Sequence, residues 1–299
     1  MAAIKPASSI AEQIIKLQSR GLIIEDLSFA TYWLENVGYY RLSGYWWPMQ
    51  TDKVNHVFKA GSRFESVIKL YQFDQELKHL VFDVIEKIEV SFRARLINVF
   101  SLAYEPNWFE QPSFFKNQKH FLKNLEIIDR ELNNSKEEFI LDHKNKHSTT
   151  LRPPSWKTLE ILSLGHLSKL YNNLKDNSRK SLIANGFTLP TYDYLESWLT
   201  VMTDLRNICA HHSRLWNRSI LSGIKPLKVN HPGWLSEYPQ QDKNKIYLPL
   251  SSLAYLLHAI AADGQFKRGL KRLIACYPSV DIHAMGFPPH WENEPVWQS

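Results

Sequence analysis

The stretch FESVIKLYQFDQELKHLVFDVIEKIEVSFRARLINVFSLAY, residues 64–104, carries the strongest structural signal in the chain. Its apolar residues recur every three or four positions, which is the period of an α-helix and not that of a β-strand. Because one helix of this length would far exceed the average, we expect either one very long helix or a break near Asp74. Comparable spacing recurs along most of the chain, and the sequence therefore predicts an all-α fold.

Helical spacing, helix caps and chain breakers predict most of the other elements. Ser9 and Glu12 form a capping-box pattern, and the helix that it begins is expected to end near Gly21. Further helices are predicted over residues 26–36, 117–133, 156–163, 166–175, 178–185, 192–212 and 249–275, with a short one between a cap at 135–138 and His147. Residues 49–62 favour a loop or a short hairpin, residues 219–248 an irregular segment, and the chain after residue 275 an extended tail. We expect a single domain over residues 1–299, in which residues 249–299 form the C-terminal helix and tail.

The composition narrows the class of protein. The chain has 299 residues, of which 44% are hydrophobic and 22% charged, as in ordinary globular proteins. No apolar stretch approaches the roughly 18 residues that a membrane span requires, and the first residues lack the apolar core of a signal peptide, so we expect a cytoplasmic protein without a membrane partner. Two cysteines, Cys209 and Cys276, are too few for a disulfide framework or a cysteine zinc site. The net charge of +6 suits a polyanionic partner without establishing one.

The most informative segment for function is DLRNICAHHSRLWNR, residues 204–218. On a helix, which turns by about 100° per residue, Asn207 and His211 lie on one face and Asp204 is nearly aligned with them. Either Asp204 or Asn207 is therefore placed to hydrogen-bond one imidazole nitrogen of His211. Arg206 lies roughly 140° away from His211 around the helix. A site that uses both side chains would need a bent helix end or a second copy of the helix across a two-fold axis.

The segment RNICAHHSRLWNR, residues 206–218, resembles the signature of the Abi-like (AbiD/AbiF) abortive-infection family, within the HEPN superfamily. Three other stretches resemble the same family: GYYRLSGYWWP at 38–48, LYQFDQELKHLVFDVIEKIEVSFRARL at 70–96 and PPSWKTLEILSLGHLSKLY at 153–171. The resemblance covers about residues 10–275. It departs from the family at Leu164, where relatives often carry Phe, and this departure touches no residue of the expected chemistry.

The resemblance implies a HEPN-type helical bundle with additional N-terminal and C-terminal helices. It also implies metal-independent cleavage of RNA, without a cofactor, in defence against phage, by a site shared across a homodimer. The HEPN ribonuclease pattern is an arginine, a polar residue, three variable residues and a histidine, and it falls on Arg206, Asn207 and His211. On this basis His211 exchanges protons with the RNA, Arg206 stabilises the charge that develops on the phosphoryl oxygens, and Asn207 orients His211 or contacts the phosphate.

Further residues are candidates for supporting the site or binding RNA. Asp204, His212 and Glu160 are the candidate supporting residues, with His212 as a second acid or base. Glu160 is a candidate partner of Arg206 or of a histidine, although a structural ion pair is the simpler account. The candidate RNA contacts are Arg214, Arg218, Tyr39, Arg41, Lys267, Arg268, Lys271 and Arg272. The alternative for the basic stripe at residues 267–272 is a solvated helix face, and we favour packing over base stacking for Trp216.

The histidines His143 and His147 are four residues apart, a spacing that suits a metal ion on a helix. No third ligand lies near them in the sequence, so we expect no metal site there.

Two functions other than RNA cleavage remain open. The same arginine and histidine side chains would also suit a non-catalytic RNA-binding protein that works with a small structured RNA. A protein-interaction scaffold is the third alternative. The salt dependence of partner binding distinguishes the RNA-binding role from the scaffold role. Contacts to phosphate weaken steeply as the salt concentration rises, whereas a protein scaffold should bind its partner with little dependence on salt.

Overall fold

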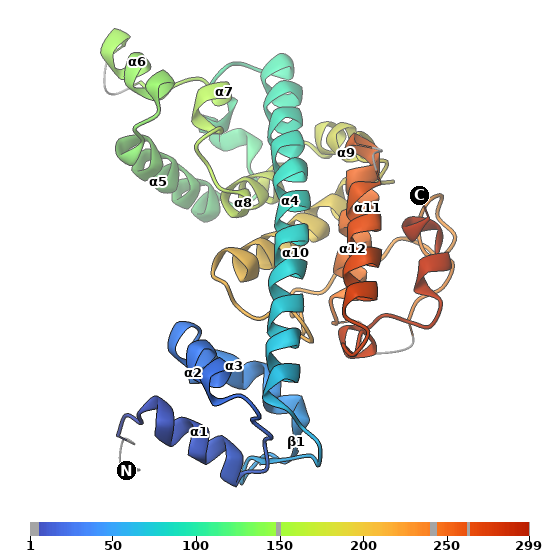
Figure 1. The fold of residues 1–299 in the computed structure, drawn as a ribbon. Helices are drawn as coiled ribbons and strands as arrows, with labels where there is room; N and C mark the ends of the chain where they lie inside the picture. The colour runs from blue at the N-terminus through green and yellow to red at the C-terminus, as the bar shows by residue number, and fades with distance from the viewer. Residues whose placement is uncertain (1–5, 148–150, 240–243, 262–263, 299) are drawn as a thin grey trace. The chain divides into compact units, whose positions relative to one another are not determined.

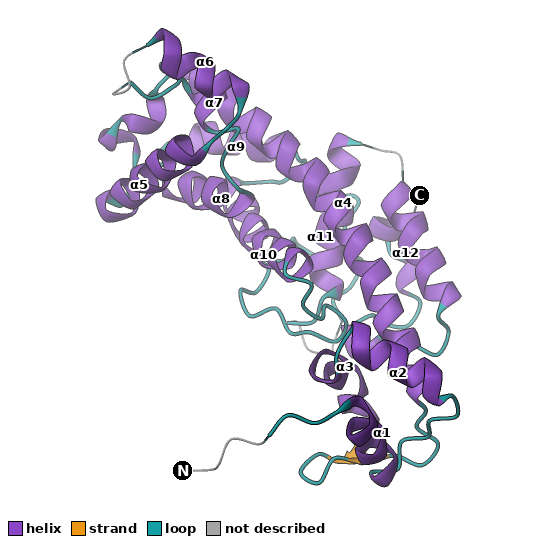
Figure 2. Cartoon of the chain, turned by 60° about the vertical axis from the view of Figure 1, so that its left-hand side comes forward, coloured by secondary structure: helices purple, strands orange, loops and turns teal. Residues whose placement is uncertain are grey.

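The computed structural model describes residues 6–147, 151–239, 244–261 and 264–298. Helices make up most of the secondary structure of these residues, and the strands among them are confined to one small hairpin (Figure 2). The all-α prediction is confirmed. The chain divides into two compact units, the first made of residues 1–78 and 273–280 and the second of residues 79–272 and 281–299. Within the part of the chain that the structure describes, no helix combines the length and the apolar character that a membrane span requires.

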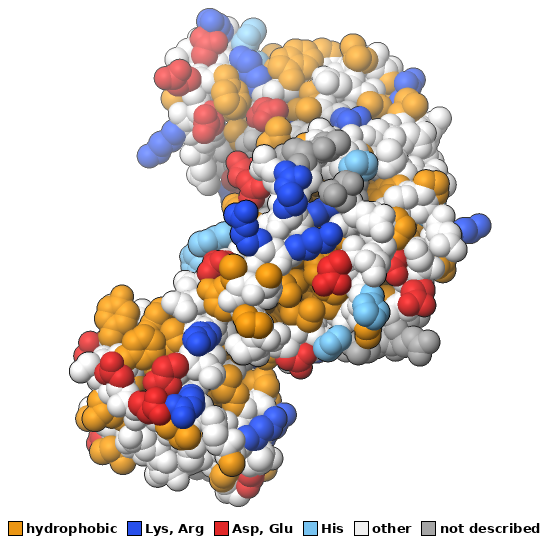
Figure 3. Space-filling model, turned by 45° about the vertical axis from the view of Figure 1, so that its right-hand side comes forward, with side chains coloured by type: hydrophobic (Ala, Val, Ile, Leu, Met, Phe, Trp, Pro, Cys, Tyr) orange, Lys and Arg blue, Asp and Glu red, His pale blue; other side chains and the backbone are white. Residues whose placement is uncertain are grey.

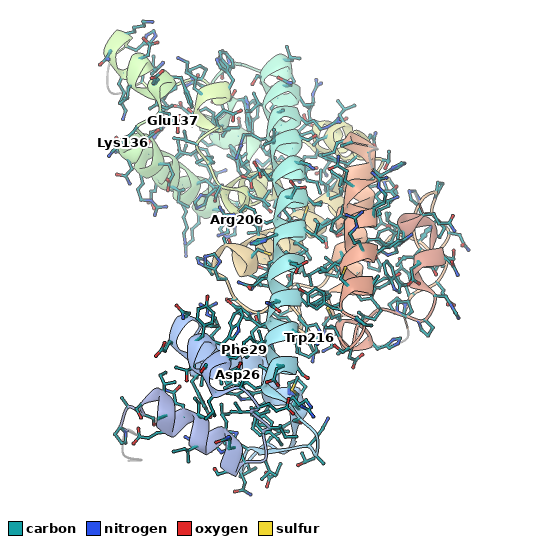
Figure 4. The ribbon with its side chains drawn as sticks, viewed as in Figure 1. Asp26, Phe29, Lys136, Glu137, Arg206 and Trp216 are labelled. Carbon is teal, nitrogen blue, oxygen red and sulfur yellow. The ribbon has the colours of Figure 1, made fainter. Side chains whose placement is uncertain are left out.

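The first unit contains three short helices and a hairpin. The elements are α1 (Ile10–Ser19), α2 (Leu27–Asn36), α3 (Tyr39–Trp46), β1 (Gln50–Asp52) and β2 (Val57–Phe58), shown in blue in Figure 1. The predicted capping box is present, since Ser9 Oγ accepts from the Glu12 N–H and the Glu12 carboxylate accepts from the Ser9 N–H at 2.7 Å. Asp26 caps α2 by accepting from the Phe29 N–H at 2.9 Å (both labelled in Figure 4). The hairpin alternative for residues 49–62 is confirmed, and residues 39–46, which the sequence left unassigned, form α3.

A buried polar network lies in the aromatic core of the first unit. Tyr45 donates its hydroxyl hydrogen to Asp74 Oδ2 at 2.7 Å, and Lys78 Nζ lies 3.1 Å from the same carboxylate oxygen. The Asp74 side chain is fully buried. The ring of Tyr71 packs edge-on against that of Tyr45, with the ring centroids 5.3 Å apart. This unit therefore buries charge as well as aromatic surface, and the buried charge is paired.

Helix α4 (Phe64–Ala103) is one uninterrupted helix. The alternative of a break near Asp74 is wrong, because the Asp74 side chain bonds sideways to Tyr45 and Lys78 instead of capping a helix end. The apolar residues on its inner face are almost completely buried: Phe64, Val67, Phe73, Leu77, Val81, Val84, Ile88, Phe92, Leu96 and Phe100. Tertiary packing along the whole length, and not helix propensity alone, stabilises a helix this long.

The second unit continues α4 and adds most of the remaining helices. They are α5 (Gln118–Asn134), α6 (Glu138–Lys146), α7 (Ser155–Thr158), α8 (Leu164–Asn173), α9 (Asn177–Asn185), α10 (Tyr192–Ala210), α11 (Tyr247–Ile260) and α12 (Gln265–Cys276). Helix α10 packs against α8, α9 and α11. At its centre Trp198 is fully buried and packs on Trp234, with ring centroids 5.2 Å apart, while its indole N–H donates to the Lys225 carbonyl at 2.7 Å. The irregular segment after α10 is thus fastened to the core.

Three predicted elements need correction. The single helix over 249–275 is two helices, because Ala261 is extended and Gly264 adopts a positive φ of 63°. Helix α7 is a single turn, which ends where Leu159 and Leu162 turn into the core. The chain after α12 is not an extended tail: it forms 3-10 turns at residues 283–285, 291–293 and 295–297, and its Trp side chains at 291 and 297 are buried.

Candidate functional site

The end of α10 is defined by a left-handed residue. His211 is the last residue of near-helical conformation, and His212 follows with a φ of 53°. The His212 N–H donates to the Cys209 carbonyl at 3.0 Å, and the Ser213 N–H donates to the Ile208 carbonyl at 2.9 Å. This pair of bonds is the Schellman motif, which satisfies carbonyls at the helix end and turns the chain back. The motif therefore fixes where His211 stands.

The segment after the turn is anchored at three points. The Trp216 side chain is buried, and its indole N–H donates to the Asp281 carbonyl at 3.3 Å. Lys245 Nζ donates to Asn217 Oδ1 at 2.6 Å, and the Ile220 N–H donates to the Asn244 carbonyl at 2.7 Å. Because of these anchors, residues 213–221 are held against the end of α10. The packing role favoured for Trp216 is the one observed.

Between α10 and this returning segment lies a pocket of about 320 Å³. Its lining residues are Asp204, Asn207, Ile208 and His211 from α10, and Ser213, Arg218, Ser219, Ile220 and Leu221 from the returning segment. The predicted helix face thus opens into a cavity. Among the described residues, however, no hydrogen bond joins the imidazole of His211 to Asp204 or Asn207, so the expected orienting bond is not formed in the single chain.

Arg206 is not among the residues that line this pocket. It is half-buried on α10, labelled in Figure 4, and its guanidinium makes no hydrogen bond or ion pair with the residues that the structure describes. The helix end does not bend enough to bring Arg206 into the pocket beside His211. The second copy of the helix, which the sequence also allowed, stays a prediction.

Arg218 is the cation that shares the pocket with His211. Its side chain is exposed, and NH1 donates to the Arg214 carbonyl at 3.4 Å. Arg214 is half-buried, and His212 is exposed; neither lines the pocket. A phosphate in this pocket would therefore meet Arg218 and His211 together.

Glu160 belongs to a different part of the second unit. Its carboxylate lies 3.7 Å from Arg93 NH1, and Arg93 also pairs with Glu89 at 2.8 Å and donates to the Leu162 carbonyl at 2.9 Å. Glu160 lines a separate pocket of about 570 Å³ next to α5 and α6, together with Lys136 and Glu137, which are labelled in Figure 4. The structural ion pair is thus observed, and no bond to Arg206 or to a histidine accompanies it among the described residues.

The basic stripe on α12 is less uniform than its sequence suggests. Lys267 is buried and donates to the Gln298 carbonyl at 2.7 Å, so it does not belong to a solvent-facing stripe. Burial lowers the pKa of its amine. Arg268 and Arg272 are exposed and Lys271 is half-buried. Lys and Arg side chains gather on the face shown in Figure 3.

Tyr39 and Arg41 lie on α3 in the first unit, whereas the pocket at the end of α10 lies in the second. The Tyr39 hydroxyl accepts from Arg20 NH1 at 3.2 Å, and its ring packs edge-on against Trp46 at 4.9 Å. Tyr39 is therefore engaged in packing. Arg41 is exposed.

No cluster of three or more metal-binding side chains is found among the described residues. The rings of His143 and His147 pack against each other with centroids 4.5 Å apart, and His143 Nε2 lies 3.3 Å from the Leu151 carbonyl oxygen. Desolvation lowers the pKa of His143. Cys209 is buried within the motif, and Cys276 is exposed.

Sequence reasoning missed the second wall of the pocket. Residues 218–221 fall in a segment without periodicity, and only Arg218 was a candidate there. Periodic patterns report on helices and strands, and a returning loop is positioned by anchors that are distant in the sequence. The Pro- and Gly-rich composition of residues 219–248 indicated irregular structure but not where it would lie.

Comparison with known proteins adds one match. A family model described as Abi-like protein matches residues 32–217, from α2 through the Arg206, Asn207 and His211 string to the anchored Asn217. Searches of curated proteins and of solved structures found no match.

Proposed function

The chain belongs to the Abi-like protein family, and we propose that it acts in abortive infection as a metal-independent endoribonuclease of the HEPN type. The observation that carries this proposal is the pocket at the end of α10, where Asn207, His211 and Arg218 line one cavity. A base, a hydrogen-bonding amide and a cation beside one cavity are the groups that RNA transesterification requires.

The reaction uses a nucleophile that the RNA itself carries. His211 removes the proton of a ribose 2′-hydroxyl, and the 2′-oxygen attacks the adjacent phosphorus atom. The bond between phosphorus and the 5′-oxygen then breaks, and the leaving oxygen takes up a proton from the imidazolium that His211 has become or from a water molecule. The products are a 2′,3′-cyclic phosphate and a 5′-hydroxyl. No oxidant, reductant or metal ion enters this balance.

Charge on the phosphoryl oxygens increases in the transition state, and guanidinium groups suit it because they present a fork of N–H donors. Arg218 suits this role within the chain, and its support is that it lines the same pocket as His211. Arg206 is placed for it only from a second subunit, since it lies outside the pocket of its own chain. We therefore propose a homodimer in which Arg206 of one chain completes the site of the other. Asn207 would contact the phosphate or orient His211.

The test is cleavage of total RNA by the purified protein in EDTA, with end-group analysis of the products. We expect wild-type protein to leave 2′,3′-cyclic phosphate ends, and His211→Ala to cleave about 10²–10⁴-fold more slowly, which is the usual contribution of a general acid or base. His258→Ala is the matched control, because His258 is exposed and does not line this pocket. Equal stability of the RNA with wild-type protein and with His211→Ala, under every activating condition tried, would show that the protein is not a ribonuclease.

A non-catalytic RNA-binding role is the second candidate, and the exposed cations Arg218, Arg268 and Arg272 favour it. It predicts that one defined RNA species co-purifies with the protein and that His211→Ala leaves this RNA bound and unchanged. Sequencing of the RNA that co-purifies with each form distinguishes the two roles.

A further inference from the structure

Another pocket lies between α5 and α8, which run side by side in Figures 1 and 2. Its volume is about 380 Å³. Helix α5 contributes His120, Lys123, Asn124 and Ile127 from one face, and helix α8 contributes Lys169, Asn172 and Asn173. Two packed helices normally bury apolar side chains against each other. Polar and cationic side chains in such a groove therefore call for a functional explanation.

Two of the asparagines that line this pocket each carry a buried amide atom without a hydrogen-bond partner among the described residues. These atoms are the Nδ2 donor of Asn124 and the Oδ1 acceptor of Asn172. The neighbouring Asn173 is different, since its Oδ1 accepts from the Asn117 N–H at 2.9 Å and its Nδ2 donates to the Asn117 carbonyl at 3.0 Å. Buried polar atoms are nearly always paired in proteins, so one unpaired donor and one unpaired acceptor on residues that line the same cavity are consistent with a ligand that supplies both partners.

The charge of the pocket is positive. Lys123 and Lys169 are exposed, and neither makes an ion pair or a hydrogen bond with the residues that the structure describes. No carboxylate is among the described residues that line the pocket. Free ammonium groups at the rim of a cavity attract an anion, and a phosphate is the anion that lysine most often binds as a point charge.

We propose that this groove binds a nucleotide, with the edge of the base at Asn124 and Asn172 and the phosphate at Lys123 and Lys169. The edge of a nucleobase presents a donor and an acceptor side by side, which matches the unpaired amide atoms. Ile127, which is half-buried, supplies an apolar wall for the base. The nucleotide is either free or one unit of an RNA chain, and the second case rests on the proposed function because it makes the groove a docking site for the RNA.

Calorimetric titration of the full chain tests this site. The ligands are AMP, GMP, CMP and UMP, and a short single-stranded RNA of mixed sequence that is titrated into the His211→Ala protein so that it stays intact. We expect saturable binding that weakens about tenfold in Asn124→Leu and in Asn172→Leu, which is the effect of losing one hydrogen bond. Lys123→Met and Lys169→Met should weaken binding and reduce its salt dependence. Lys119→Met, on the same helix but outside the pocket, is the matched control and should bind like the parent.

Thermal unfolding of the same variants separates a binding role from a structural one. Replacing an unpaired buried amide by leucine should leave the unfolding temperature unchanged or raise it, while binding falls. If the pocket variants bind the monophosphates more weakly than the parent protein does, the ligand is a free nucleotide. If they weaken only the binding of the RNA, the ligand is one unit of an RNA chain. Binding that no pocket variant alters, or the absence of binding by both kinds of ligand, would overturn the site. The cleavage assay with His211→Ala is independent of these results, so failure of the groove leaves the ribonuclease proposal to its own test.

Discussion

His212 shows how a single residue can end a helix and shape a pocket. A φ of 53° is costly for a residue with a side chain, and glycine is the usual residue at this position of a Schellman motif. Histidine is among the residues that tolerate this region better than most. His212 does not line the pocket, and its backbone conformation ends α10.

The effect of a substitution at His212 on stability should therefore depend on how well the new residue tolerates a positive φ, and not on the chemistry of its side chain. We expect the free energy of unfolding of His212→Gly to exceed that of His212→Val by at least about 1 kcal/mol, because a β-branched residue is strained at positive φ. RNA cleavage by His212→Gly should stay near the wild-type rate. Chemical denaturation and the cleavage assay measure the two effects. A large loss of cleavage in a stable His212→Gly protein would instead identify His212 as an acid or base.

Lys180 is a fully buried cation in the second unit. It is paired with Glu196, and its ammonium lies 4.6 Å from the ring centroid of Tyr192 and 4.9 Å from that of Tyr171. Lys116 also approaches the Glu196 carboxylate, at 3.7 Å. Burial lowers the pKa of Lys180 to about 8, and the pairing with Glu196 opposes that effect.

The lowered pKa of Lys180 predicts a pH dependence of stability. Between about pH 8 and the ordinary lysine value of 10.5 the unfolded chain holds this proton and the folded chain releases it. The unfolded state then binds more protons, so the contribution of Lys180 to the free energy of unfolding rises with pH in this window. Chemical denaturation at several pH values should show the rise in wild-type protein relative to Lys180→Met, in which Glu196 keeps its ion pair with Lys116. Parallel curves for the two proteins would contradict the assignment.

Helix α4 carries two ion pairs of the same i,i+4 spacing in very different surroundings. Asp74 and Lys78 are buried, with Tyr45 as a third member, whereas Asp83 is exposed and Lys87 is only half-buried. A buried pair that loses one member leaves a charge without compensation, whereas an exposed pair contributes little.

The two pairs should therefore respond differently to the same substitution. We expect Asp74→Ala to lower the free energy of unfolding by about 3 kcal/mol or more, because Lys78 remains buried. Asp83→Ala should change it by less than about 1 kcal/mol. Urea denaturation followed by circular dichroism compares the two variants. Similar effects at the two sites would mean that burial does not decide the strength of these pairs.

The position of Arg206 outside its own pocket has a consequence for assembly. If Arg206 of one chain completes the site of another, the two residues of one working site come from different subunits. A chain that lacks Arg206 and a chain that lacks His211 would then complement each other.

Mixing the purified Arg206→Ala and His211→Ala proteins tests this arrangement. After subunit exchange half of the dimers are mixed, and each mixed dimer holds one intact site of two, so activity should recover to about a quarter of the wild-type value. Each variant alone should be inactive in the RNA cleavage assay. Activity that stays absent in the mixture, with exchange verified by size and mass, would place both residues in the site of one chain.

Local sequence determined the helices of this protein and the order of groups along them. The capping box at Ser9 and the face shared by Asp204, Asn207 and His211 followed from periodicity and side-chain chemistry, because both depend on neighbours within one or two turns. The family resemblance likewise followed from contiguous residues, and the match over residues 32–217 confirms it. The finer site assignments stay predictions.

Contacts between distant segments decided the rest. The burial of Lys267 against Gln298 and the pairing of Glu160 with Arg93 join segments that no local pattern relates. The segment that walls the pocket beside His211 is anchored in part by the bond from Trp216 to Asp281, 65 residues further along the chain. Such contacts form where folding brings surfaces together. The free energy of burial determines which of them form, and the spacing of residues along the sequence does not.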